Sequence, residues 1–552
     1  MRTRATSAID VALSLAALSL AACTDGGAPL TTGGRILDGR DLTDVWFWRP
    51  RSLAYGRQPA SGASGAEDLW VRELDEGEPR VALRDLGWSS SEHWPIVRIG
   101  NLLATGTELT LAYDVDTHTS ATFYLGMVAL RPDGRALAHW TYPNLADDTV
   151  AIGPLDGLRG VPGFIVRAAA FMGDDLVALG HRTEDPLGEQ VLARLSPADS
   201  STSVLVSGLP AWDPALNDSI VSSCRDLSPE MCRFFQVLGC TADTPACPET
   251  GEIPCAIVYA RDVPGSTPGS TPASFDVAAY DVNRAMEVPI EARVRFDSRL
   301  LRSPDGRRIA WTDGTALNVW DACARRALQC AGPVELGAAE ISPGAWRPDG
   351  RAVRTILGRQ SLLMMSAEDG SCILPATVAP TFVFYSGDGT KMGWLDQPFS
   401  GPDRTLWMAD GLARGAVALA SGPIVDAFFS ADTRFLVIRR LHDSTGSIGV
   451  IDLNAASPIE RPIASATSFT IALGARRLAA LTRWNSQDQS GQVELFDLER
   501  ETSTVLAERA TTLTVAGSVD DAVDIAYVVR TRVPSAFDGL WLATLPAAGA
   551  PR

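Results

Sequence analysis

The sequence predicts an all-β fold built from repeated units, because one short phrase recurs along the chain at a nearly constant spacing. The phrase joins an apolar start, an Asp-Gly pair and a second apolar run, as in LRPDGRALAHW (130–140), LRSPDGRRIAW (301–311), WRPDGRAV (346–353) and YSGDGTKMGW (385–394). The marker aspartates are separated by 41, 131, 44, 39 and 44 residues, and they are Asp133, Asp174, Asp305, Asp349, Asp388 and Asp432. The longest gap is close to three units of 44 residues. A period of about 40–45 residues that contains several short strands is typical of the blades of a β-propeller.

The phrase has the composition of a tight turn between two strands. Pro presets φ for the first central position, Asp hydrogen-bonds the local backbone, and Gly adopts positive φ without strain. We therefore interpret its residues as structural turn-makers, without a chemical role, at Asp133, Gly134, Asp305, Gly306, Asp349, Gly350, Asp388 and Gly389.

A second recurring segment agrees with this period. It is a short apolar run ending in an acidic or small residue, found at 109–114, 277–282, 316–321, 405–410, 448–453 and 493–498. We expect these segments to be the third strands of successive blades. Tryptophans recur at nearly the same phase of this strand, at Trp70, Trp320, Trp407 and Trp541. Equal phase predicts packing between blades, with sugar stacking as the alternative.

Together the two markers resemble the TolB-like, WD-type propeller repeats of bacterial envelope proteins, in which Ser-Pro-Asp-Gly-x-x-Ile-Ala-Phe/Tyr joins a blade's first two strands. The resemblance covers most of residues 40–546 and is strongest over 296–500. It implies four-stranded antiparallel blades. The hairpins favour two tandem rings, an N-terminal one over 36–295 and a six-bladed one over 296–546, ahead of one ring of seven or eight blades. A single ring would use a strand near 35–48 to complete the last blade, whereas two rings would use one near 288–294.

The N-terminus resembles a bacterial lipoprotein signal. Two arginines precede an apolar stretch over 11–22, and the sequence Leu-Ala-Ala-Cys ends at Cys23. The stretch is too short for a permanent transmembrane helix. The resemblance implies removal of residues 1–22, a lipid on Cys23, a flexible tether over 23–35 and a place in the envelope, with Thr24 favouring the outer membrane. An ordinary signal peptide is the alternative.

The other cysteines predict disulfide bonds, because an even number in an exported protein favours pairing. They are Cys224, Cys232, Cys240, Cys247, Cys255, Cys323, Cys330 and Cys372. We expect Cys323 to pair with Cys330, and Cys372 to pair with one member of the group between 224 and 255. Structural zinc, the alternative, usually needs cysteine pairs two to four residues apart, which the sequence lacks.

The cysteine-rich run 224–255 replaces the short turn of one unit, so we interpret it as a stapled insertion that projects from one face. We expect it to separate strands at 219–223 and 256–260. Such a loop serves either to pin an exported segment or to bind a partner.

No pattern indicates catalysis, a metal or a cofactor. No Gly-x-Ser-x-Gly or His-Glu-x-x-His occurs, and the histidines are isolated. The net charge of −18 argues against nucleic acid. The sequence therefore favours a lipid-anchored scaffold that binds a protein or glycan partner. The alternative is a propeller hydrolase or lyase with an acidic or metal site in its central channel, where His139 and His181 are the candidate ligands.

Overall fold

A computed structural model describes most of the protein after residue 33. The described residues are 34–38, 42–49, 51–57, 66–74, 78–87, 97–99, 102–105, 109–114, 116–124, 126–131, 133–141, 149–184, 189–209, 235–241, 244–261, 274–295, 300–331, 344–357, 361–376, 380–396, 403–442, 445–465, 471–473, 476–485, 487–517, 523–530 and 538–545. All regular elements among them are β-strands, which confirms the all-β class. No helix in these segments is long and apolar enough to cross a membrane. The signal peptide and Cys23 lie outside the described residues.

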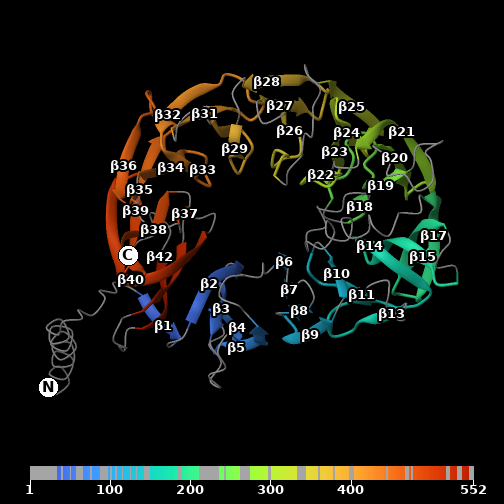
Figure 1. Cartoon of the computed structure of the whole chain (residues 1–552), viewed down its shortest axis with the longest axis horizontal. Coiled ribbons are helices and arrows are strands. Elements are labelled where there is room, and N and C mark those ends of the chain that lie inside the picture. The colour runs from blue at the N-terminus through green and yellow to red at the C-terminus, as the bar shows by residue number, and fades with distance from the viewer. Residues whose placement is uncertain are drawn as a thin grey trace, which may run out of the picture. The chain divides into compact units, whose positions relative to one another are not determined.

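The protein divides into two compact units, and each is described by itself. Unit 1 combines Met1–Ser89 with Pro423–Arg552, and unit 2 is Ser90–Gly422. Within both units, strands that follow one another in the sequence pair antiparallel in sheets of mostly four strands (Figure 1). This arrangement is consistent with the blades of a propeller.

Unit 2 contains seven of the described sheets, each formed by consecutive strands. They are β6–β9 (Val97–Ile99, Leu102–Thr105, Leu109–Asp114, Thr119–Tyr124), β10–β13 (Gly126–Leu130, Leu137–Thr141, Val150–Gly153, Arg159–Val161), β14–β17 (Phe164–Met172, Asp175–Arg182, Gln190–Ser196, Ser201–Leu209), β18–β21 (Phe235–Gly239, Cys255–Arg261, Ser274–Asp281, Met286–Arg295), β22–β25 (Leu301–Arg302, Arg308–Thr312, Ala316–Asp321, Arg326–Ala331), β26–β28 (Ala352–Leu357, Ser361–Ser366, Cys372–Ala376) and β29–β32 (Pro380–Tyr385, Lys391–Asp396, Arg404–Asp410, Val417–Gly422). In the three-stranded sheet, an isolated bridge between Trp346 and Val353 stands where the other sheets have their first strand.

The described residues of unit 1 form the other three sheets. They are β2–β5 (Leu42–Arg49, Ser52–Arg57, Ala66–Glu73, Arg80–Gly87), β33–β36 (Ile424–Phe429, Phe435–His442, Thr445–Asp452, Glu460–Ser465) and a seven-stranded sheet of β37–β42 (Ile471–Leu473, Arg477–Asn485, Ser490–Asp497, Thr502–Gly517, Val523–Val529, Gly539–Leu545) with β1 (Gly34–Asp38). The long strand β40 pairs with β39 over its first half and with β41 over its second half, so it links two four-stranded parts.

The N-terminal strand β1 pairs antiparallel with β42 and thereby completes the sheet of the C-terminal hairpin. This is the pairing that the single-ring alternative requires near residues 35–48. The segment 288–294, which two rings would need for the same purpose, lies in β21 and pairs with β20 in its own sheet. All six predicted third-strand segments occupy the third position of their sheets, in β8, β20, β24, β31, β35 and β39.

The core lies between neighbouring sheets, because successive side chains of a strand point to opposite faces. On β23, Ile309 and Trp311 pack with strands of sheet β18–β21, whereas Ala310 packs with strands of sheet β26–β28. Both faces are covered, so β23 is buried at every position. This burial explains why such strands appear in the sequence as continuous apolar runs without alternation.

Candidate binding site

The predicted turn residues form four turns of one geometry. In each turn the Gly N–H donates to the carbonyl of the residue three positions earlier, at 2.8–2.9 Å. The glycines have φ of 68–70°, a region that favours glycine. Each Asp carboxylate accepts a hydrogen bond from the backbone N–H two residues later, at 3.0–3.1 Å. The carboxylates at 133, 305, 349 and 388 therefore shape the turns.

Two further marker aspartates lie in variants of this turn. Asp174 belongs to a two-residue turn, since Met172 pairs directly with Asp175. At Asp432 the geometry persists, but Thr433 takes the glycine position with a φ of 62°. Its N–H donates to the Ser430 carbonyl at 2.9 Å.

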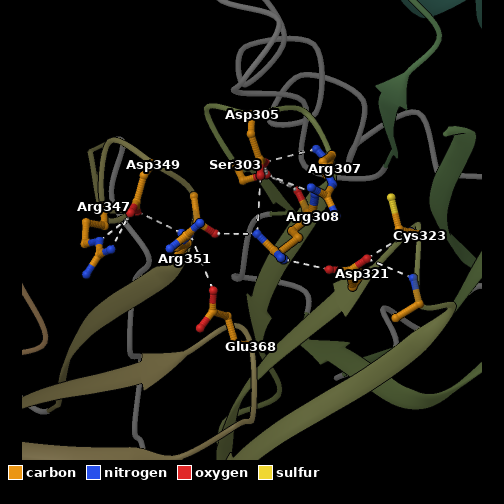
Figure 2. Close-up of polar contacts among 12 residues, drawn as sticks. Ser303, Asp305, Arg307, Arg308, Asp321, Cys323, Arg347, Asp349, Arg351 and Glu368 are labelled. Atoms are coloured by element: carbon orange, nitrogen blue, oxygen red, sulfur yellow. Dashed lines mark hydrogen bonds and ion pairs between the residues drawn. The ribbon is translucent and has the colours of Figure 1, made fainter. Parts of the chain in front are cut away.

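Sheets β22–β25 and β26–β28 are joined by a buried arginine, and we name this contact the Arg308 junction (Figure 2). The Arg308 side chain donates from Nε to Asp321 Oδ2 at 2.7 Å and from Nη1 to Asp305 Oδ2 at 3.3 Å. Its Nη1 also donates to the Gly350 carbonyl at 3.0 Å. A Cβ on Gly350 would lie 2.8 Å from the carboxyl carbon of Asp305, so only glycine fits without a shift.

Asp349, in the turn of the second sheet of this junction, has a pKa below its ordinary value of 3.8. Burial opposes ionisation, but the Arg347 guanidinium and the Arg351 N–H outweigh burial. Arg347 Nε donates to Asp349 Oδ1 at 2.7 Å.

Sheets β26–β28 and β29–β32 are joined by a different buried arginine, at what we name the Arg354 junction. Arg354 is 7 % exposed and donates from Nη2 to the carbonyls of Gly344 and Val383, at 3.2 and 3.0 Å. Its guanidinium lies 5.9 Å from the centre of the Tyr385 ring. No carboxylate among the described residues pairs with it, and burial lowers the pKa of Arg354. Burial also raises the pKa of Tyr385 to about 12, so this phenol is neutral.

Among the described residues of unit 2 there are three disulfides, one within a sheet and two that link three consecutive sheets. Their pairs are Cys240–Cys255, Cys247–Cys323 and Cys330–Cys372. The first closes the β18–β19 hairpin, the second joins the insertion to the turn after β24, and the third joins β25 to β28. Cys224 and Cys232 lie outside the described residues.

The predicted pairing of Cys323 with Cys330 is wrong, and so is the pairing of Cys372 with the group 224–255. Cys323 lies in the turn before β25, and Cys330 lies near the end of that strand. An extended strand rises about 3.3 Å per residue, which separates the two cysteines beyond the reach of a disulfide. The third disulfide instead joins fourth strands of neighbouring sheets.

The boundaries of the insertion also differ from the prediction. β18, within the predicted run 224–255, is the strand that pairs with β19, and residues 219–223 lie outside the described residues. The loop between β18 and β19 runs from Cys240 to Pro254. A fully buried apolar run, FQVLG, precedes Cys240, and this signal identifies the strand that the cysteine spacing obscured.

A cavity of about 200 Å³ lies beside this loop, and we name it the stapled cavity. Its lining comes from the loop, from the turn between β20 and β21, and from the turn between β24 and β25. The Cys240–Cys255 and Cys247–Cys323 disulfides both contribute to it. Two sheets and a covalently fixed loop therefore form one concave site.

The charged side chains of the stapled cavity form one connected group. Asp281 Oδ2 accepts from Arg284 Nη1 at 3.1 Å and from Arg325 Nη2 at 2.8 Å. Arg284 Nη2 also donates to Glu252 Oε2 at 3.2 Å. These residues were not predicted from the sequence. The sequence pattern that could have identified them is an Asp at the end of a third strand, followed three or four residues later by an Arg. It occurs in DVNR (281–284) and DACAR (321–325).

The phased tryptophans lie in the third strands β4, β24, β31 and β42. Each stands opposite a second-strand residue, namely Tyr55, Ile309, Trp394 or Tyr527. Each also packs in or against an apolar cluster. Their equal phase therefore reflects packing.

The two candidate histidines do not form a metal centre with their described neighbours. His139, on β11, stacks on Phe123 with ring centroids 4.4 Å apart. His181 is buried on β15. Among the described residues, no group of three or more His, Cys, Asp or Glu side chains could hold a metal ion.

The sequence matches no known family model and no curated protein. Among solved structures the protein is similar to a eukaryotic initiation factor, at 12 % identity over 81 % of this chain and 93 % of that chain, with a TM-score of 0.38. It is also similar to a prolyl endopeptidase, at 10 % identity over 90 % and 55 %, with a TM-score of 0.33. A tricorn protease follows at 11 % identity over 92 % and 61 %, with a TM-score of 0.28. These likenesses are too low to carry an argument about activity.

Proposed function

We propose that the protein is an envelope lipoprotein, anchored through Cys23, whose four-stranded sheets are propeller blades and whose stapled cavity binds a protein or glycan partner. The stapled cavity is the observation that carries this proposal. Loops held on a rigid scaffold often carry recognition, and concave sites with a few placed charges suit binding. Two disulfides reduce the freedom that the loop would lose on binding.

The disulfides also support export, because such bonds persist in oxidising compartments. Lipid attachment rests on the sequence Leu-Ala-Ala-Cys. We expect a fatty acid with a clickable tail to label the wild-type protein in growing cells and to leave Cys23→Ala unlabelled. Equal labelling of both proteins would contradict the anchor.

Photo-crosslinking in intact cells tests the binding site. A photoreactive amino acid replaces Ile253, at the edge of the stapled cavity, or Arg194 as a control on an exposed ion pair elsewhere in unit 2. We expect a discrete adduct with one envelope component from position 253 and none from position 194.

The adduct should depend on the fixed loop. Cys247→Ser with Cys323→Ser releases the loop from sheet β22–β25, whereas Cys330→Ser with Cys372→Ser removes a disulfide that does not line the cavity. The first pair of substitutions should abolish the adduct and the second should preserve it. Identical adducts in both would contradict a site at the stapled cavity.

A further inference from the structure

The side chains around the stapled cavity discriminate between the two kinds of partner. Among the described residues that line the cavity there is one aromatic side chain, Trp320, and it is only 2 % exposed. A sugar ring that stacks on protein needs an open aromatic face, which a buried indole does not offer. The lining therefore disfavours a glycan.

Aliphatic side chains stand exposed at the same place. Ile253 lines the cavity and is 40 % exposed, whereas Met286, which is 50 % exposed, lies beside the lining. Met286 pairs in register with Asp281, and the Ile253 carbonyl accepts a hydrogen bond from Asn283 Nδ2 at 3.0 Å. The two apolar side chains therefore flank the charged group of the cavity, where they suit an aliphatic side chain of a partner.

Arg325 supplies a positive charge and N–H donors that can bind a ligand. A guanidinium has five N–H donors, and with described residues the side chain of Arg325 makes one ion pair, to Asp281, while it remains 37 % exposed. Arg284, by contrast, is shared between Asp281 and Glu252. A ligand carboxylate can therefore bind Arg325 through two parallel hydrogen bonds without displacing Asp281.

The surrounding charge limits the ligand to a small anionic group. The lining carries two arginines and two acidic side chains, so it is locally neutral, while the whole protein has a net charge of −18. Such a surface repels polyanions but tolerates one carboxylate that is held at short range.

We infer that the stapled cavity binds a protein segment in which an aliphatic side chain lies beside a carboxylate. The aliphatic group packs on Ile253 and Met286, and the carboxylate pairs with Arg325. Either an Asp or Glu side chain or the C-terminus of the partner supplies the carboxylate. This inference rests on the proposed binding function. Of the two kinds of partner proposed there, it selects a protein over a glycan.

Peptide and glycan arrays, probed with the full-length labelled protein, test the inference. One set of random peptides has free C-termini, and a second set is amidated so that carboxylates come only from Asp and Glu. We expect enrichment of peptides with Leu, Ile, Val or Met next to a carboxylate. Loss of these hits on amidation identifies a C-terminus as the source, and their retention identifies a side chain.

Two matched variants locate the binding. Arg325→Gln keeps a polar side chain of similar length and should weaken the best peptide about tenfold, because a charge-assisted pair is lost. Arg194→Gln alters a comparable exposed pair in unit 2 and should leave the affinity unchanged. Unchanged binding by Arg325→Gln, or hits without a carboxylate, would overturn the inference.

The arrays separate failure of the inference from failure of the proposed function. Binding to glycans alone would leave the scaffold function standing and refute a protein partner. Binding to neither array, with no adduct from position 253 in cells, would refute both.

Discussion

Unit 2 joins its neighbouring sheets by two buried arginines whose surroundings differ in charge. At the Arg308 junction the guanidinium lies between Asp321 and Asp305 and also reaches the Gly350 carbonyl. At the Arg354 junction two carbonyls and the face of a neutral tyrosine surround the guanidinium, without a carboxylate among the described residues. The first arginine therefore neutralises buried charge, whereas the second introduces it. The same residue type should stabilise the two contacts to very different degrees.

The largest effect should come from Arg308→Met. The substitution leaves Asp321 buried without its cationic partner, although Oδ1 still accepts from two backbone N–H groups. Loss of one member of a buried ion pair costs about 3–5 kcal/mol in the free energy of unfolding. Urea unfolding measures this loss. Adding Asp321→Asn removes the stranded charge and should recover part of the stability. If the double variant is no more stable than Arg308→Met, the unpaired carboxylate of Asp321 is not the cause of the lost stability.

The next effect concerns the disulfide that spans the same two sheets. Cys330→Ser with Cys372→Ser opens a link between residues 42 positions apart, which typically costs about 2–4 kcal/mol. No disulfide among the described residues spans the Arg354 junction. The effect of Arg354 substitutions on stability should therefore be the same with and without reductant. Unfolding followed with and without reductant gives the value. A wild-type protein whose unfolding is insensitive to reductant would contradict a stabilising role for these bonds.

Substitution of one glycine at each junction allows a direct comparison of the two. Gly350 has φ of 70° and faces the Asp305 carboxyl group, while Gly344 has φ of 80° and nothing within 4 Å of an added Cβ. Gly344→Ala should cost about 1 kcal/mol, from backbone strain alone. Gly350→Ala should cost about 2 kcal/mol or more, because the methyl group also displaces Asp305. Equal costs in thermal unfolding would show that the contact with Asp305 is not a constraint.

The sequence was sufficient to predict what depends on local residues. The turns at Asp305 and Asp349 follow from Pro, Asp and Gly acting on their own backbone, and the third strands follow from short apolar runs with an acidic end. The contact from Arg308 to Gly350 crosses between sheets over 42 residues, and no local pattern encodes it. The predicted disulfide partner of Cys323 was wrong for the same reason, because its actual partner, Cys247, lies in a loop of the preceding sheet.

The stapled cavity could be predicted only in part. The cysteine spacing indicated an unusual insertion over 224–255, of which the structure describes a disulfide-bonded loop from Cys240 to Pro254. The partners of this loop lie in two turns that have no unusual composition. Arg325 meets Asp281 of the preceding sheet, so their pairing requires knowledge of how sheets stack. Asp321, which precedes Arg325 by four residues, pairs with Arg308 instead, so the local Asp-to-Arg spacing does not reveal this contact.

A smaller effect is expected at the second junction. Arg354→Met removes a buried charge and keeps an unbranched apolar side chain, a kind of change that is often neutral or stabilising. Loss of the bonds to the Gly344 and Val383 carbonyls opposes this gain, so the free energy of unfolding should change by less than about 1 kcal/mol. A loss as large as that of Arg308→Met would mean that Arg354 has an anionic partner outside the described residues.

The smallest effect is a difference in pH dependence between Arg347→Gln and Arg354→Met. Because the pKa of Asp349 is lowered in the folded state, its ionised form contributes stability above the ordinary value of 3.8, and this contribution is lost as the pH falls through the lowered pKa. Arg347→Gln should therefore be less stable than the wild type at neutral pH, and this difference should shrink over the acidic range below about pH 5, as Asp349 becomes protonated. Arg354 pairs with no described carboxylate, so the difference between Arg354→Met and the wild type should stay constant over the same range. Urea midpoints measured across this range decide the comparison, and parallel curves for both variants would contradict the role assigned to Arg347.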